Sequence, residues 1–480
     1  MTSNVLTRSS RDGAAARLPQ PAATLLRDGA GHDPLRGNRR RRALELTGVQ
    51  LLAWLSVAVV VAIYLGDRGL SGWDDAKGVL KSVGILTGLV SADLMCLMLL
   101  LAARIGWLER LLGQDRALAR HSGLGSWVVG GVMAHGILLV GSYAMSQQTG
   151  WLDEFVLLWG VRDVALAVMA AALLLVVGLS SAVLALRRHL PYELWHGVHL
   201  TTYLAVALSI PHQFTTATLF ESGWARAWWI GLYGLTAFCL LTWRVLLPLL
   251  VSLRQGLVVT RVEELDDDVA AITMRGRDVA SLRIRGGQFA HWRFWTPGLV
   301  WQQHPLSLSA MPRGDELRIT VRGLGRGSAR MLRLRPGTRV SLQGPYGRFS
   351  DVARTREFVV MIGSGTGIAP IRALLEDTRT LPGRALVVLR ASAPGQLHHL
   401  EEFRELCRAR GIALVTLVGP RGEGWTPAGS EGVGLCELAP WVREADLYVC
   451  GPRDWAALVQ AEALALGVPG EQLHREDFSF

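Results

Sequence analysis

Four histidines in two apolar stretches of this 480-residue chain have the spacing of paired metal ligands. His121 and His135 lie fourteen residues apart, which is about 21 Å of helix and close to four turns. His199 and His212 lie thirteen residues apart, about 19.5 Å, a looser match that distortion near Pro211 could absorb. Because imidazole is a good ligand of haem iron, two facing helices with these residues would hold two haems at two depths.

Ordinary structural roles compete with this interpretation. A single histidine within a membrane is explained about as readily by a carbonyl partner as by a ligand role, but four at matched spacing favour the ligand role. His196 lies three residues before His199, on a similar helix face. It stays open as an alternative ligand, a partner of a haem propionate or an interfacial residue.

A glycine-rich segment between a strand-like run and a helix-like run is typical of a dinucleotide site. Its glycines would let the backbone approach phosphate, and the helix dipole would favour the anion. The residues concerned are Gly363, Ser364, Gly365, Thr366, Gly367 and Pro370. Cys450, Gly451 and Pro452 end a later strand-like run, and carboxyl ends of parallel strands share one sheet edge. Cys450 is therefore a candidate catalytic residue beside a nicotinamide, and the alternative is a buried structural cysteine.

Further segments have the chemistry of a flavin site. In the extended segment His304, Pro305, Leu306 and Ser307, the serine could hydrogen-bond a flavin nitrogen, unless it is an ordinary strand residue. A candidate pyrophosphate cradle before a helix-like run consists of Arg322, Gly325, Gly327 and Ser328. An ordinary glycine-rich turn would explain that segment equally well. Phe480 could stack on the flavin ring or be a frayed hydrophobic end.

The elements that must position the histidines are six apolar runs, each about as long as a bilayer crossing requires. They lie near 44–65, 82–103, 122–145, 164–186, 193–212 and 227–250. Arginine and lysine concentrate at alternate ends of these runs, which by the positive-inside rule places both termini in the cytoplasm. The pair of His121 and His199 is then nearer the cytoplasm, and the pair of His135 and His212 nearer the outside.

Composition excludes several other classes of protein. Hydrophobic residues make up 50% of the chain and charged residues 19%, below the roughly 25% of an ordinary soluble domain. The net charge of +10 gathers beside the apolar runs, so membrane topology explains it and nucleic-acid binding is not predicted. The five cysteines form no closely spaced pair, which excludes a disulfide scaffold and a ferredoxin-type cluster.

After residue 250 the pattern changes to short strands with turns, and then to strand–turn–helix units. The predicted fold is multidomain: a six-helix transmembrane bundle, an antiparallel β-barrel FAD domain and an α/β parallel-sheet nucleotide-binding domain. The predicted boundaries are a disordered cytoplasmic tail over 1–42, the haem-binding membrane domain over 43–250, the FAD domain over 251–350 and the NAD(P) domain over 351–480.

From about residue 43 onward, these motifs together resemble the ferric reductase/NADPH oxidase superfamily of membrane flavocytochromes. In that family a six-helix domain binds two b-type haems through histidine pairs on its third and fifth helices, and a ferredoxin-reductase-like module binds FAD and nucleotide. Residues 192–195 are similar to the start of the family's fifth helix, and residues 344–347 to the loop that closes its flavin barrel. Leu306 departs from the aromatic residue usual at that position.

The resemblance implies a cell-membrane oxidoreductase. It would pass electrons from cytoplasmic NADPH or NADH through FAD and two b-type haems to an extracytoplasmic acceptor, ferric iron or oxygen. Its partners would be the lipid bilayer, the nicotinamide nucleotide and that acceptor. The alternatives are a membrane-tethered, haem-free flavin reductase or diaphorase, and a haem-binding redox sensor or docking subunit. Arg390, near a strand end, could meet the 2′-phosphate of NADPH, but does not decide between the two nucleotides.

Overall fold

The structure is a computed structural model that describes residues 34–68, 73–182, 192–215, 223–430 and 432–476. It separates into two compact units, one of which spans Leu44–Leu246, while the other contains the described residues before Leu44 and those from Leu247 onward. The helix α1 (Pro34–Arg68) begins inside the segment expected to be a disordered tail, so residues 34–42 are helical. The rest of that tail lies outside the described residues.

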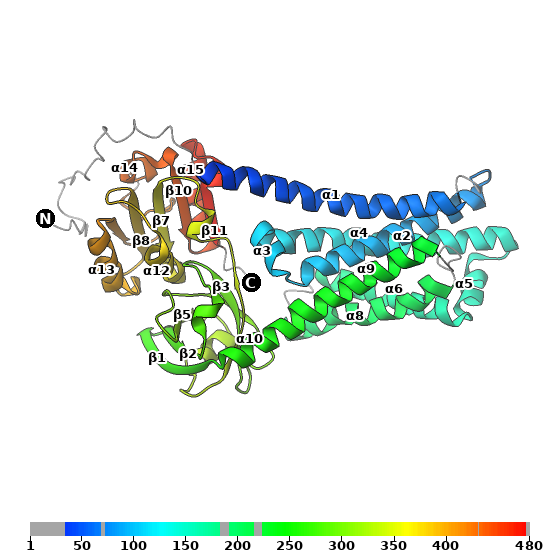
Figure 1. The fold of residues 1–480 in the computed structure, drawn as a ribbon, viewed down its shortest axis with the longest axis horizontal. Helices are drawn as coiled ribbons and strands as arrows, with labels where there is room; N and C mark the ends of the chain where they lie inside the picture. The colour runs from blue at the N-terminus through cyan, green and yellow to red at the C-terminus, as the bar shows by residue number, and fades with distance from the viewer. Residues whose placement is uncertain (1–33, 69–72, 183–191, 216–222, 431, 477–480) are drawn as a thin grey trace. The chain divides into compact units, whose positions relative to one another are not determined.

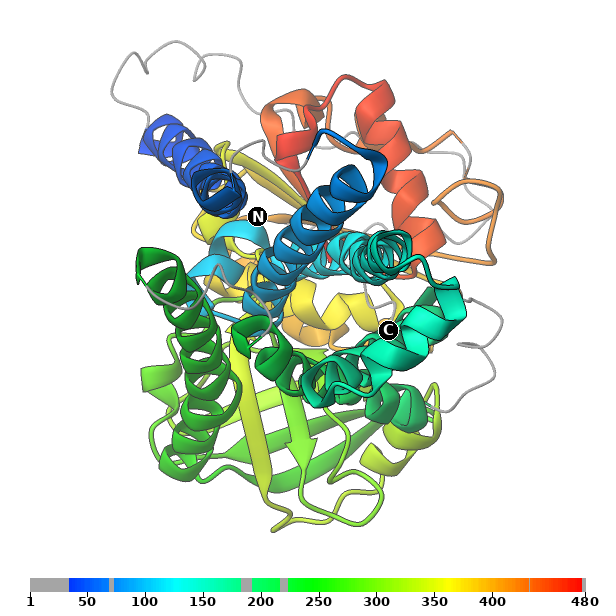
Figure 2. The same ribbon diagram turned by 90° about the vertical axis from the view of Figure 1, so that its right-hand side faces the viewer.

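The first unit consists of helices that run alongside one another in Figure 1 and are seen end-on in Figure 2. After α1 come α2 (Ala76–Ala102), α3 (Gly106–Leu112), α4 (Gln114–Gln147), α5 (Trp151–Trp159), α6 (Arg162–Ala182), α8 (Tyr192–Thr215), α9 (Gly223–Cys239) and the π-helical segment η3 (Leu240–Leu246). Glycines let α2 and α4 approach closely. A Cβ at Gly84 would lie 3.0 Å from the side chain of Leu139, and a Cβ at Gly131 would lie 2.1 Å from the Ser91 hydroxyl.

Five helices of the described chain are long and apolar enough to cross a membrane. They are Leu44–Gly66, Ala76–Ala102, Arg116–Gln147, Arg162–Ala182 and Gly223–Gln255. The predicted span at 193–212 is helical, as α8, but is not among the five, because its histidines and threonines lower its mean hydropathy. The predicted helical region with candidate membrane spans is thus confirmed, and the count of six spans is not.

In the second unit, α10 (Leu247–Gln255) leads into two three-stranded antiparallel sheets. One has the order β1 (Val258–Asp266), β2 (Val269–Arg275), β5 (Glu316–Arg322), and the other has the order β4 (His304–Ser307), β3 (Phe289–Phe294), β6 (Val340–Tyr346). Alternate apolar residues from both sheets, such as Ile272 and Trp292, share one core. The predicted barrel is not closed in the described chain, because the two sheets are linked by isolated bridges such as Val258 to Arg339 and Leu308 to Ile319.

The remaining strands form the predicted parallel sheet. Its order is β11 (Leu473–Glu476), β10 (Ala445–Cys450), β7 (Phe358–Ser364), β8 (Ala385–Ala391), β9 (Ala413–Val418). One face packs against α12 (Ile368–Asp377) and α13 (Leu400–Arg410), and the other against α14 (Leu435–Leu438) and α15 (Arg453–Ala465). Because both faces are covered, β8 and β10 are buried along their whole length, as continuous apolar runs in parallel sheets usually are.

Candidate cofactor sites

The structure brings the four membrane histidines together in the two pairs that their spacing predicts. The ring centres of His121 on α4 and His199 on α8 are 6.0 Å apart. Those of His135 on α4 and His212 on α8 are 6.1 Å apart. Imidazole–metal bonds are about 2 Å long, so two rings on opposite sides of one metal have centres roughly 6 Å apart. Both pairs therefore fit a metal held between two helices.

Backbone carbonyls of α2 orient both histidines of α4. The Nδ1 atom of His121 lies 3.1 Å from the Met98 carbonyl oxygen, and Nδ1 of His135 lies 2.8 Å from that of Gly84. Because a carbonyl oxygen only accepts, each contact requires the proton on Nδ1 and leaves the lone pair of Nε2 available. Metal-binding histidines are commonly held in this way.

Two further observations bear on these pairs. A Cβ at Gly88 would lie 2.4 Å from Nδ1 of His135, so only glycine leaves room for that ring. Nδ1 of His199 is buried without a hydrogen-bond partner among the described residues, while the ring stacks at 5.3 Å on Trp195. The described chain contains no group of three or more His, Cys, Asp or Glu side chains arranged for a metal ion, a criterion that a two-histidine site does not meet.

The predicted flavin segment forms β4. Nε2 of His304 and Oγ of Ser307 are buried and have no hydrogen-bond partner in the part of the chain that the structure describes. Because buried polar atoms are normally paired, two orphans in one strand indicate a missing ligand and fit the edge of a flavin ring. Burial also lowers the pKa of His304, which keeps the imidazole neutral at physiological pH. Leu306 contributes its carbonyl oxygen, which accepts a hydrogen bond of 2.9 Å from the indole of Trp292.

The predicted pyrophosphate segment meets β4 at one residue. A Cβ at Gly327, in α11 (Arg326–Met331), would lie 2.9 Å from Cε1 of His304. The polar members of the segment have protein partners: Ser328 Oγ accepts from the Gly325 amide at 2.9 Å, and Arg322 donates to Asp268 at 2.7 Å. The structure thus brings the two segments together, while the role of Arg322 and Ser328 toward phosphate stays a prediction.

The two nucleotide segments meet where β7 and β10 end side by side, with Gly363 paired to Cys450. A Cβ at Gly367 would lie 2.2 Å from the Cys450 carbonyl oxygen, and one at Gly451 would lie 3.2 Å from Cβ of Ser364. The strands that follow β7 and β10 in sequence lie on opposite sides of this pair, which makes it the switch point where open α/β sheets bind ligands. The Cys450 side chain is fully buried, and its thiol donates to the Glu476 carbonyl oxygen at 3.8 Å.

Arg390 stands at the end of β8, paired in register with Ser364. Its Nη1 donates to the Ser392 hydroxyl at 3.0 Å, and its Nε is buried without a partner among the described residues. Burial and the nearby charge of Arg421 both lower the pKa of this guanidinium. An arginine stays charged even so, and is suited to an anion.

The last predicted site residue, Phe480, lies outside the described residues.

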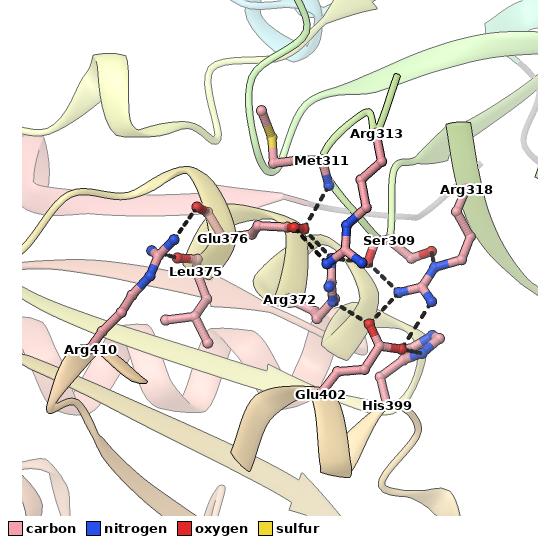
Figure 3. A network of polar contacts seen from close by, with 10 residues as sticks. All are labelled: Ser309, Met311, Arg313, Arg318, Arg372, Leu375, Glu376, His399, Glu402 and Arg410. Atoms are coloured by element: carbon pink, nitrogen blue, oxygen red, sulfur yellow. Dashed lines mark hydrogen bonds and ion pairs between the residues drawn. The ribbon is translucent and has the colours of Figure 1, made fainter. Parts of the chain in front are cut away.

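The sequence reasoning missed two sets of residues. One is Gly84 and Gly88 on α2, whose signal is a Gly-x-x-x-Gly spacing within an apolar run. The other is a charged network beside the nucleotide loop (Figure 3). Its signal is Arg372 and Glu376, an opposite-charge pair four residues apart in a mostly apolar helix.

Comparison with known proteins finds similarities of two kinds. Residues 87–210 match the family model described as ferric reductase like transmembrane component. A flavohemoprotein of Xylella fastidiosa is 26% identical over 206 residues, which cover 40% of this chain and 51% of that protein. One from Vibrio cholerae is 30% identical over 181 residues, covering 36% and 45%. The reductase component of propane 2-monooxygenase from Mycolicibacterium smegmatis is 25% identical over 244 residues, covering 45% and 68%.

The chain thus spans about half the length of the flavohemoproteins that it matches. Among solved structures, the FAD/NAD-binding domain of a Vibrio cholerae nitric oxide dioxygenase is 24% identical, with a TM-score of 0.39, and the match covers 47% of this chain and 99% of that one. The family model and the curated relatives thus define two similarities, one to a ferric reductase like transmembrane component and one to flavohemoproteins and a monooxygenase reductase component. This particular chain joins the two in one polypeptide, which confirms the predicted resemblance.

Proposed function

We propose that this chain is a cell-membrane oxidoreductase that passes electrons from cytoplasmic NADPH or NADH, through FAD and two b-type haems, to ferric iron or oxygen on the outer side. The observation that carries the proposal is the pair of histidine contacts, 6.0 and 6.1 Å between ring centres, in a chain that also has a nucleotide-type sheet edge. When bound, FAD accepts a hydride as two electrons and the haem irons take those electrons one at a time.

At the sheet edge, the backbone from Gly363 to Gly367 receives the pyrophosphate of the nucleotide. The three glycines of this loop let the backbone approach the phosphates closely, and α12 directs its N-terminal amides toward the anion. Cys450 and Gly451 close the other side of the edge, next to the nicotinamide. Arg390, paired in register with Ser364, would contact the 2′-phosphate if the nucleotide is NADPH, and the choice between NADPH and NADH stays open.

In the flavin site, Ser307 and His304 supply hydrogen-bond groups to the ring from one strand. Their unpartnered buried atoms support this assignment. Gly327 and its neighbours Gly325, Ser328 and Arg322 take the pyrophosphate.

In the membrane, His121 and His199 hold the inner haem, and His135 and His212 hold the outer one. The carbonyl oxygens of Met98 and Gly84 keep the Nε2 lone pairs of the α4 histidines available. Both termini lie in the cytoplasm, by the distribution of arginine and lysine. The domains are then the membrane domain over 43–250, the FAD domain over 251–350 and the NAD(P) domain over 351–480.

The experiment that tests the proposal is an anaerobic visible spectrum of the detergent-purified protein before and after NADPH or NADH. The proposal expects a haem Soret band that shifts to the reduced position on nucleotide addition. Flavin bleaching without a haem band, in a haem-replete preparation, would instead support a tethered flavin reductase. Haem that only dithionite reduces would support a redox sensor or docking subunit.

A further inference from the structure

A cluster of charged side chains joins the flavin-type sheets to the helices of the parallel sheet (Figure 3). Its centre is the carboxylate of Glu402 on α13. Nη1 and Nη2 of Arg318, on β5, donate to its two oxygens at 2.9 and 2.8 Å, a bidentate pair. Nε of Arg372, on α12, forms an ion pair with it at 2.7 Å, and His399 Nδ1 is 3.0 Å away. We call Arg318, Arg372, Glu376, His399 and Glu402 the clamp cluster.

The clamp cluster contacts both cofactor segments just beyond their last predicted site residue. Arg372 lies two residues after Pro370 of the nucleotide segment, and Ser309 lies two residues after Ser307 of the flavin segment. The Ser309 carbonyl oxygen accepts from Arg372 at 3.4 Å and from Arg318 at 3.2 Å. The clamp cluster therefore forms a short polar path between the two segments.

Glu376 ties the same helix to the flavin side a second time. Its carboxylate accepts from the Met311 amide at 2.9 Å and from Arg313 at 3.1 Å, and it also pairs with Arg372. On the other side of this contact, a Cβ at Gly286 would lie only 2.2 Å from the Ala373 carbonyl oxygen. The helix α12 therefore has little room to shift against the flavin-type sheets.

The charges in the clamp cluster are matched and partly buried. Arg372 is 1% exposed. Burial opposes ionisation of Glu402, but hydrogen bonds from His399 and Arg318 and the charges of Arg318 and Arg372 outweigh it, so its pKa is held well below the ordinary value. The carboxylate is therefore ionised at physiological pH. Removing its charge would leave Arg318 without its carboxylate partner and Arg372 with Glu376 alone, which is unfavourable for partly buried charges.

We propose that Glu402 and Arg372 are positioning residues that hold the nucleotide segment and the flavin segment at the distance and angle needed for hydride transfer. The inference rests on the proposed function. In that step the hydride, two electrons with one proton, leaves C4 of NAD(P)H for the oxidised flavin, and NAD(P)⁺ remains. Such transfers are sensitive to geometry, because a misplacement of about 1 Å can slow a reaction about 100-fold.

The test compares Glu402→Gln with Glu401→Gln in the full-length, FAD-loaded protein. Glu401 is one residue away, exposed, and pairs only within α13 with Arg404 among the described contacts, so it is a matched control. Flavin reduction is followed by stopped flow with NADPH and with NADPH deuterated at C4. Hydrogen exchange of residues 309–313, whose Met311 amide donates to Glu376, is measured on the same samples.

The expected result for Glu402→Gln is a limiting rate at least about ten-fold lower, with a full deuterium isotope effect, unchanged FAD content and a KM within two-fold of wild type. Exchange at 309–313 should rise, and Glu401→Gln should match wild type in all respects. Faster exchange with an unchanged rate would overturn the inference, as would a rate loss explained by lost FAD.

If Glu402→Gln does not fold, Glu402→Asp and Arg318→Lys take its place, since both keep the charge and shorten or alter the contact. They should show intermediate rates at full FAD content, and wild-type rates would overturn the inference. A wild-type protein whose flavin is not reduced by NADPH or NADH, but whose exchange at 309–313 responds to Glu402→Gln, would instead contradict the proposed function.

Discussion

The tautomer of His121 and His135 is decided by α2 rather than by the histidines themselves. A carbonyl oxygen behind each ring fixes the proton on Nδ1 and frees Nε2. His199 has no such partner among the described residues; its ring is held by the stacked Trp195. The two rings of the pair formed by His121 and His199 are therefore held by different means, hydrogen bonding on α4 and stacking on α8.

Replacing His121 by alanine should abolish haem reduction by NADPH or NADH and leave flavin reduction intact. The reason is that the inner pair receives the electrons first in the proposed order. Stopped-flow absorbance at the flavin and Soret bands measures both steps. His196→Ala is the control, because the ring facing His121 at 6.0 Å is that of His199. Unchanged haem reduction in His121→Ala would contradict the ligand assignment, and its loss in His196→Ala would make His196 a ligand.

Gly88→Ala should lower haem content from two to one per chain, because the new methyl group would occupy space that Nδ1 of His135 fills, at 2.4 Å. The matched control is Gly130→Ala on α4, where no described atom lies within 4 Å of the Cβ position. Alanine is favoured over glycine in a helix by about 1 kcal/mol, so the control should be no less stable. The ratio of haem to protein is measured with a pyridine haemochrome assay. Two haems per chain in Gly88→Ala would show that α2 does not constrain the site of His135.

At the scale of elements, the parallel sheet gathers distant residues at one edge. Gly363, Arg390 and Cys450 belong to β7, β8 and β10, which are neighbours in the order of the sheet. Because each strand ends at that edge, loops separated by many residues in sequence come together on one side of the sheet, where open α/β sheets bind ligands.

Arg390→Ala should raise the KM for NADPH at least about ten-fold and leave the KM for NADH within two-fold. A hydrogen bond to a charged group contributes about 1.5–3 kcal/mol, and only NADPH carries the 2′-phosphate. Steady-state kinetics with both nucleotides give the ratio. Equal losses for the two would indicate that Arg390 supports the strand rather than the phosphate.

The sequence predicted those parts of the fold that depend on neighbouring residues along the chain. Hydropathy located the helices, and the change to strand–turn–helix units located the parallel sheet, because both signals lie within a single run of residues. Closure of the flavin sheets was not readable, since it depends on pairings such as Leu308 to Ile319 between separate strands. The contact of Arg318 with Glu402, 84 residues away, was missed for the same reason.

At the scale of the whole molecule, the proposed orientation of the chain in the membrane can be checked by labelling a native cysteine. Among the five cysteines, Cys436 is exposed and Cys96, Cys239, Cys407 and Cys450 are buried. A membrane-impermeant maleimide should label Cys436 in inside-out vesicles and not in intact cells, because the reductase module faces the cytoplasm in the proposal. Cys436→Ser should remove the label. Labelling in intact cells would place that module outside and reverse the direction of electron flow.

The order of strands in the parallel sheet also has a consequence for how the chain folds during synthesis. The central strand β7 ends at Ser364, but its neighbour β10 begins only at Ala445, after β8 and β9 have emerged. Until then one side of β7 presents unpaired amide and carbonyl groups and an apolar face, the features that promote misassembly. The membrane helices leave the ribosome long before β10 covers this edge. Expression yield should therefore depend on how fast residues 365–450 are translated, or on chaperones that bind the chain while they are translated.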